Sequence, residues 1–187
     1  QFKLTSGKKS PVYCDCRRII SFPEERKRLI NFGISKLKEK PKFKKISNIA
    51  GGESAGIPFA AFIAQKLNLP MTYIRKEKKK FGKNSQIEGL LNQKDNVLLA
   101  EDLMTDGGSK LKFLDAIEKL GANVSGIFVI FNYGIIKDYY LFKKKKIDVI
   151  SLTNWSHVLN VASRKKILKN DEVKIVELFL EKMKVKS

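Results

Sequence analysis

The chain has 187 residues and 43% of them are hydrophobic, so it is long and apolar enough to fold as one domain around a core. No hydrophobic run is long enough to cross a bilayer and no signal-peptide pattern opens the chain, so we expect a cytoplasmic protein rather than a membrane or exported one. Because Gln1 stands inside a segment patterned as a strand, we also expect a further N-terminal segment to precede it.

The formal net charge is +19, and a chain this basic is a candidate for nucleic-acid binding. Arginine, the usual reader of bases and phosphates, is nevertheless scarce. The lysines spread over every predicted helix and loop, as at Lys38, Lys80, Lys112 and Lys145. A general lysine bias explains that spread as well as a ligand does. We therefore expect no nucleic-acid partner, and attraction of anionic substrates is a secondary consequence of the charge.

The two cysteines, Cys14 and Cys16, are one residue apart, and on an extended chain such residues share a face. A metal site needs more ligands than this pair, and His157 is the only histidine. An isolated pair also builds no disulfide framework. The pattern indicates reduced structural thiols in a reducing compartment.

The first predicted elements are a small hairpin and a helix. Residues 2–16 alternate loosely around a Ser-Gly-Lys-Lys-Ser-Pro turn, which indicates the hairpin. Ser21 and Glu24 have the spacing of a capping box ahead of a helix. Apolar positions at helical period follow, namely Leu29, Ile30, Gly33, Ile34 and Leu37. Pro41 is expected to close that helix.

From residue 46 onward, predicted strands alternate with predicted helices. The strands cover 46–50, 71–75, 97–100, 124–131 and 147–152. The helices cover 58–67, 107–120 and 171–184, with a loop at 51–56. This alternation predicts an α/β fold, a parallel sheet flanked by helices and connected by right-handed crossovers. Ligands of such sheets bind at the carboxyl ends of the strands.

Residues 76–89 do not fit the alternation, because they are polar, lysine-rich and without a period. Long segments of this kind are usually lids over a site or solvated loops. We favour a lid, because the segment begins directly after a predicted strand, where it can fold over the ligand-binding edge of the sheet.

The segment 97–109 is the most informative stretch of the sequence. A buried strand ends in two adjacent carboxylates, Glu101 and Asp102, and a small polar loop leads into a helix. The loop amides, the hydroxyls of Thr105 and Ser109 and the helix N-terminus form a cradle for a phosphate dianion. The two carboxylates can accept hydrogen bonds from neighbouring sugar hydroxyls and help to hold Mg²⁺, a hard cation that prefers oxygen ligands.

This stretch resembles the signature with which type I phosphoribosyltransferases bind phosphoribosyl pyrophosphate (PRPP). Three further segments resemble the orotate branch of that family. Residues 2–11 are similar to its N-terminal hood, residues 56–77 to its pyrophosphate loop, helix and following strand, and residues 75–89 to its catalytic loop. The four motifs occur in the family's order and cover nearly the whole chain. The resemblance implies one phosphoribosyltransferase domain over residues 1–187, with a hood at about 1–20 and a lid at about 76–89.

The resemblance implies transfer of the phosphoribosyl group from PRPP to orotate, giving orotidine 5′-monophosphate and pyrophosphate, with Mg²⁺, in pyrimidine biosynthesis. It also implies a cytoplasmic homodimer with shared active sites. The catalytic candidates are Lys79, where the family keeps its loop lysine, and Asp102. The expected PRPP-binding residues are Arg75, Lys76, Lys79, Glu101, Asp102, Leu103, Met104, Thr105, Asp106, Gly107, Gly108 and Ser109. Thr105, Tyr13 and Cys14 are expected at orotate, and Glu101 and Asp102 at Mg²⁺, indirectly, with PRPP.

Positive charge near the pyrophosphate fits the reaction, because negative charge builds on the leaving group as its bond to the ribose breaks. A closed lid would exclude water from the ribosyl cation. Four positions depart from the residues that relatives carry, with Phe81 in place of a histidine, Thr5 and Ala55 in place of lysines, and Tyr133 or Asn132 in place of an arginine. They bear on orotate more than on PRPP. His157 is interpreted as structural.

Three alternatives stay open on the sequence. One is a PRPP-dependent transferase for another base, with the same cradle and a different hood. Another is a PRPP-sensing regulator on the same fold that binds nucleic acid, since a fold does not fix a function. Such a regulator needs no working catalytic loop, yet Arg75, Lys76 and Lys79 are all present. A last one is an inactive domain of a larger polypeptide.

Overall fold

A computed structural model describes residues 2–3, 9–78, 85–105, 107–134 and 142–185. Within these ranges, six strands form one sheet in the order β5-β4-β3-β6-β7-β8. Neighbours pair in parallel, except that β5 runs antiparallel to β4 at the edge. The strands are β3 (Asn48–Gly52), β4 (Met71–Ile74), β5 (Ile87–Glu88), β6 (Asn96–Met104), β7 (Asn123–Asn132) and β8 (Val149–Asn154). The α/β fold with a mostly parallel sheet is confirmed.

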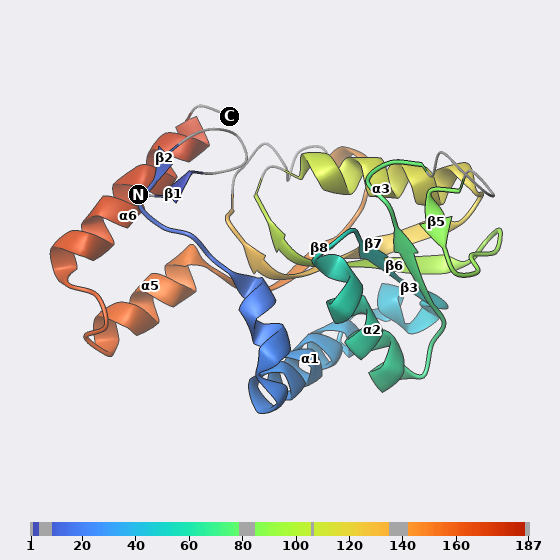
Figure 1. Cartoon of the computed structure of the whole chain (residues 1–187), viewed down its shortest axis with the longest axis horizontal. Helices are drawn as coiled ribbons and strands as arrows, with labels where there is room; N and C mark the ends of the chain where they lie inside the picture. Colours follow the sequence, from blue (N-terminus) through green and yellow to red (C-terminus); the bar gives the residue numbers. More distant parts are fainter. Residues whose placement is uncertain (1, 4–8, 79–84, 106, 135–141, 186–187) are drawn as a thin grey trace.

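Helices cover both faces of the sheet (Figure 1). One face packs against α1 (Pro23–Lys38) and α2 (Gly56–Leu67), and the other packs against α3 (Gly108–Lys119). Successive residues of the buried strands serve opposite cores, since Leu98 and Phe128 face α1 and α2 whereas Leu99 and Ile127 face α3. This period of two, with apolar residues on both faces, explains why the central strands are continuous hydrophobic runs.

A smaller lobe stands to one side of the sheet, at the left of Figure 1. It contains the hairpin of β1 (Phe2–Lys3) and β2 (Lys9–Ser10), with α5 (Trp155–Arg164) and α6 (Asn170–Val185). The hairpin lies beside α6 (Figure 1). Residues 11–15 connect it to the short 3-10 helix η1 (Cys16–Ser21), which leads into α1. The predicted hairpin is therefore confirmed, although its strands end at Ser10.

The predicted capping box is wrong. The N-cap of α1 is Phe22, which makes no side-chain cap bond, and Pro23 is the first helical residue. Proline suits that position because its missing N–H has no helical partner there. The helix also ends at Lys38, ahead of Pro41, which instead opens the 3-10 helix η2 (Pro41–Lys45).

Other differences concern boundaries and two missed elements. The acidic strand β6 reaches Met104 rather than ending at residue 100, so both carboxylates lie inside it. The strand β5 lies within 76–89 and was not predicted. The helix α5 was also not predicted, although Asn154 caps it through a hydrogen bond that the backbone N–H of His157 donates to its side chain, 3.0 Å.

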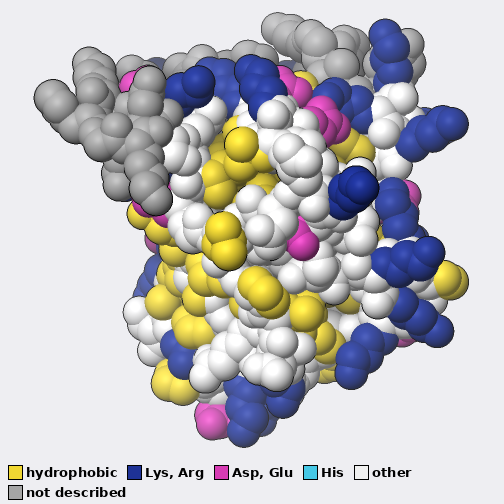
Figure 2. All heavy atoms as spheres, turned by 90° about the vertical axis from the view of Figure 1, so that its right-hand side faces the viewer, with side chains coloured by type: hydrophobic (Ala, Val, Ile, Leu, Met, Phe, Trp, Pro, Cys, Tyr) yellow, Lys and Arg dark blue, Asp and Glu magenta, His cyan; other side chains and the backbone are white. Residues whose placement is uncertain are grey.

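The Lys and Arg side chains are distributed over the surface, as their spread along the sequence predicts (Figure 2). Figure 2 shows one face of the molecule, on which Lys and Arg side chains lie around the rim and hydrophobic side chains lie through the middle. Among the described residues, no helix is long and apolar enough to span a membrane.

Candidate active site

The carboxyl ends of β3, β4, β6 and β7 lie at one end of the sheet, because these strands pair in parallel. Parallel pairing sets β3 against β6 with Gly51 opposite Ala100, so the turn after β3 meets the acidic end of β6. Ligands of open parallel sheets bind at such an edge. The structure thus brings the predicted phosphate segment and the predicted pyrophosphate turn together.

Glu101 is the most deeply buried acid at this edge, with 4% of it exposed. Its Oε2 lies 3.4 Å from Nζ of Lys110, whereas its Oε1 is buried without a hydrogen-bond partner in the structure. Burial raises the pKa of Glu101 to about 7, and the nearby Lys110 ammonium only partly opposes that rise. Lys110 thus holds one oxygen of this carboxylate, and the other is enclosed without a hydrogen-bond partner.

Asp102 follows in the strand and is also buried. Burial raises its pKa, against the opposing effects of a hydrogen bond from the backbone N–H of Leu103 and of the Lys110 and Arg17 charges. Neighbouring strand residues point to opposite faces, so the two carboxylates flank the end of the strand rather than lie side by side. Among the described residues, no group of three or more Asp, Glu, His or Cys could hold a metal ion by itself.

The predicted phosphate cradle lies between β6 and α3. Gly107 adopts a left-handed conformation with φ of 70°, which glycine tolerates best, and its carbonyl accepts from the N–H groups of Lys110 and Leu111. The first turn of α3 contains no acidic residue, so no carboxylate within that turn neutralises the positive end of the helix dipole. Thr105 and Ser109 flank this turn, and Asp106 lies outside the described residues.

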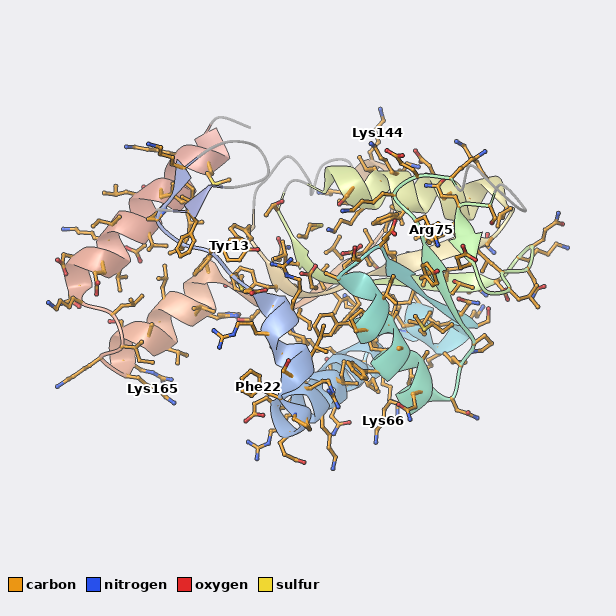
Figure 3. All side chains as sticks on the ribbon, viewed as in Figure 1. Tyr13, Phe22, Lys66, Arg75, Lys144 and Lys165 are labelled. Carbon is orange, nitrogen blue, oxygen red and sulfur yellow. The ribbon has the colours of Figure 1, made fainter. Side chains whose placement is uncertain are left out.

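Arg75 (labelled in Figure 3) and Lys76 follow β4, and both contact Glu53, which opens the turn of residues 53–55. The Arg75 guanidinium lies 2.9 Å from a carboxylate oxygen of Glu88 and 3.9 Å from one of Glu53. Glu53 also accepts a hydrogen bond from the backbone N–H of Lys76, 2.9 Å. In this structure Arg75 is therefore engaged with two glutamates, and Lys79 lies outside the described residues.

The connection from the hairpin to η1 carries the residues predicted at the base. Tyr13 is exposed, stacks on Phe2 and accepts a hydrogen bond from Arg17. It lies between the smaller lobe and the sheet (Figure 3). The backbone N–H of Cys14 points to the hydroxyl of Tyr133, 3.5 Å, and Tyr133 packs edge-on against Phe131 and Trp155.

Sequence reasoning missed Lys110, the buried partner of Glu101, and the two glutamates that hold Arg75. A lysine in the first turn of the helix after an acidic pair was the available signal for Lys110. His157, interpreted as structural, lies on the exposed side of α5. A cavity of about 640 Å³ lies between α5, α6 and the ends of β7 and β8, and neither Glu101 nor Asp102 lines it.

The fold and this edge define a class of protein. A family model described as "Phosphoribosyl transferase domain" matches residues 23–162. An orotate phosphoribosyltransferase from Rhizobium rhizogenes is 43% identical over 180 residues, which are 96% of this chain and 78% of that protein. The chain belongs to the orotate phosphoribosyltransferase family, and it is a pentosyltransferase of pyrimidine biosynthesis.

Solved structures share the fold. The orotate phosphoribosyltransferase from Aeropyrum pernix superposes with a TM-score of 0.75 at 26% identity, covering 87% of this chain and 89% of that one. The orotate phosphoribosyltransferase of Mycobacterium tuberculosis H37Rv, solved in complex with PRPP, superposes with a TM-score of 0.64 at 20% identity, covering 82% of this chain and 86% of that one.

Proposed function

We propose that the chain transfers the phosphoribosyl group of PRPP to orotate, releasing pyrophosphate and forming orotidine 5′-monophosphate. The observation that carries the proposal is the end of β6, where buried Glu101 and Asp102 stand directly before the turn into the N-terminus of α3. A sugar phosphate fits such an edge, because its hydroxyls meet carboxylates while its phosphate meets backbone amides and a helix dipole.

PRPP would lie along the segment from Glu101 to Ser109, with its 5′-phosphate at the turn that Thr105, Gly107 and Ser109 build. The two carboxylates would accept hydrogen bonds from the ribose hydroxyls. Oε1 of Glu101, which is buried without a partner, supports this role because a buried acceptor gains from a donor that a ligand supplies.

Mg²⁺ fits the same end of β6, because carboxylate oxygens are the hard ligands that this ion prefers. Glu101 and Asp102 would hold it indirectly, together with oxygens of PRPP. Two carboxylates leave most positions around such an ion to oxygens of PRPP and to water. Bound there, the ion would neutralise charge on the pyrophosphate.

The leaving group would be met by Arg75, Lys76 and Lys79. Positive charge held near the departing pyrophosphate stabilises the transition state more than the ground state, because the negative charge grows as the bond breaks. The Arg75 side chain would exchange its contacts with Glu53 and Glu88 for contacts with PRPP. Lys79 has the principal catalytic role in this proposal. Asp102 is the second catalytic residue, and it would contact the ribose.

Orotate would lie between Thr105 and the connection that carries Tyr13 and Cys14, beside Tyr133. We further propose a cytoplasmic homodimer in which each catalytic loop closes over the partner's site.

A spectrophotometric assay tests the reaction. The chain, Mg²⁺ and PRPP are mixed with orotate, loss of orotate absorbance is followed, and the product is identified as orotidine 5′-monophosphate by chromatography. Parallel reactions with uracil, adenine and hypoxanthine test the choice of base. Turnover of another base in place of orotate would refute the assignment of the base, and PRPP binding without any turnover would refute the assignment as a transferase.

A further inference from the structure

The two cysteines form a contact that the proposed reaction does not use. Their sulfur atoms lie 3.5 Å apart, and both side chains are free thiols. They flank Asp15 at the point where the connection from the hairpin enters η1. The sequence contains no other cysteine, so any reaction of a thiol in this chain occurs here.

The two thiols differ in exposure and in acidity. Cys14 is half-buried, whereas Cys16 is 3% exposed and belongs to the hydrophobic core. The hydrogen bond between the two sulfur atoms lowers the pKa of Cys14, and the same bond together with burial raises the pKa of Cys16. Because the thiolate is the reactive form, Cys14 is the sulfur that a small reagent meets first. Cys16 stands behind it within reach of a second step.

The pair is connected to the proposed substrate site through Tyr133. The backbone N–H of Cys14 points to the Tyr133 hydroxyl, and the backbone N–H of Tyr133 donates to the carbonyl of Met104, 2.9 Å. Met104 is the last residue of β6, directly before Thr105. The negative charge of Asp102 also raises the pKa of both thiols, which places the pair within the electrostatic reach of that carboxylate.

We propose that Cys14 and Cys16 are a reversible oxidation site, at which a small-molecule disulfide converts the two thiols into one intramolecular disulfide and thereby lowers transferase activity. The Cys14 thiolate displaces one thiolate from the reagent and forms a mixed disulfide. Cys16 then releases its proton to solvent and attacks the Cys14 sulfur, which expels the second thiolate. The chain loses two hydrogens, and the reagent becomes two thiols.

The geometry permits this step at a cost to the connection. A disulfide bond is about 2.05 Å long, so the sulfur atoms must approach each other by about 1.5 Å. Closing the ring reorients the Cys14 peptide, whose N–H is directed at Tyr133. Tyr13 and Cys14 are the proposed orotate contacts, so oxidation should raise KM for orotate more than KM for PRPP.

The experiment treats the whole reduced chain with glutathione disulfide, blocks remaining thiols with iodoacetamide and measures intact mass and activity. We expect a loss of two hydrogens, no glutathione adduct and no alkylation. We also expect at least a fivefold loss of kcat/KM for orotate, which dithiothreitol reverses. In C16S, which keeps Cys14 but lacks the second thiol, the mixed disulfide should persist as one glutathione adduct. C14S should stay unmodified, because its remaining thiol is buried.

Two results would overturn the proposal. A wild-type chain that keeps both thiols, or that accumulates a stable glutathione adduct, has no working dithiol pair. If the wild-type chain forms the disulfide and its transferase activity is unchanged, the two cysteines do not regulate that activity. Only the activity part rests on the proposed function, since the mass shift is measured whether or not the reduced chain transfers anything. The wild-type masses also decide the point if a serine variant fails to fold.

Discussion

Oε1 of Glu101 lies against the backbone of Gly52, in the position that a Cβ atom on residue 52 would occupy. The ring of Phe113, from α3, closes the same space. A side chain on residue 52 would therefore displace either the carboxylate or the ring. The glycine of β3 and the glutamate of β6 are thus one structural unit, and it holds the proposed substrate carboxylate at a fixed place at the end of the sheet.

Gly52→Ala should destabilise the fold and impair the site. Overpacking of a closed interior costs about 1–3 kcal/mol, and the Glu101 carboxylate is the group that would have to move. Urea unfolding gives the stability, and KM for PRPP reports the site. Gly134→Ala is the matched control, because none of the described atoms lies within 4 Å of its added carbon and only its φ of 73° disfavours alanine, by about 1–2 kcal/mol. If Gly52→Ala and the wild type are equally stable, the Glu101 carboxylate can move away from residue 52 at little cost in stability.

Glu101 should make the chain less stable as the pH rises. Burial raises its folded pKa to about 7 from the ordinary value of 4.5, so the folded state binds the proton more tightly than the unfolded state does. Between these two pH values only the folded chain is protonated at Glu101, and stability falls by about 3 kcal/mol in all as the pH rises through that window. Urea unfolding from pH 4.5 to 7.5, without Mg²⁺ or PRPP, measures the slope.

Glu101→Gln should flatten that slope, since the amide does not titrate. Glu118→Gln is the control. Glu118 lies on α3, the helix that carries Lys110, but it is exposed and paired with Lys145 at the surface. If the slope survives in Glu101→Gln, other groups cause it and the carboxylate of Glu101 is not the source.

The buried strands could be predicted from the sequence because burial on both faces leaves a continuous apolar run, as in Leu98, Leu99 and Ile127. The residue at which β6 ends could not be predicted. Charged residues normally mark the end of a strand, but β6 continues past Glu101 because it pairs with β7 as far as Met104, and Lys110, nine residues later, lies against the buried carboxylate. The short strand β5 likewise depends on pairing with β4, which no local pattern encodes.

The start of α1 shows a different limit. Ser21 and Glu24 have capping-box spacing, but Pro23 between them fixes the backbone for a first helical position and moves the cap to Phe22. At the candidate site, Glu101, Asp102 and the α3 turn lie at the carboxyl end of β6, where the motif predicts them, and their roles stay predictions. The pairing of Arg75 with Glu53 and Glu88 could not be foreseen, because it joins residues from three separate segments.

Asp102→Asn should weaken productive binding of PRPP and Mg²⁺. The substitution keeps the shape of the side chain and removes the negative charge, so hydrogen bonds to ribose hydroxyls and to the ion's water shell lose strength. A charged hydrogen bond is worth about 1.5–3 kcal/mol, and KM for PRPP should therefore rise by about 10- to 100-fold. Calorimetric titration of PRPP with Mg²⁺ checks the affinity. Asp115→Asn, an exposed acid of α3 that pairs with Lys145, provides the control. Unaltered affinity and rate in Asp102→Asn would mean that this carboxylate does not meet the substrate.

Lys79→Ala should lower kcat heavily while leaving the fold intact, because its charge acts mainly on the pyrophosphate as the bond breaks. Removing one preorganised electrostatic contact of this kind usually costs about 100- to 1000-fold in kcat. Lys78→Ala is the neighbouring control, since Lys78 is exposed and has no proposed role. Steady-state kinetics with orotate and PRPP separate kcat from KM, and circular dichroism checks the fold. Equal turnover in the two variants would remove Lys79 from the catalytic assignment and would return the proposal to Arg75 and Lys76 as the cations at the leaving group.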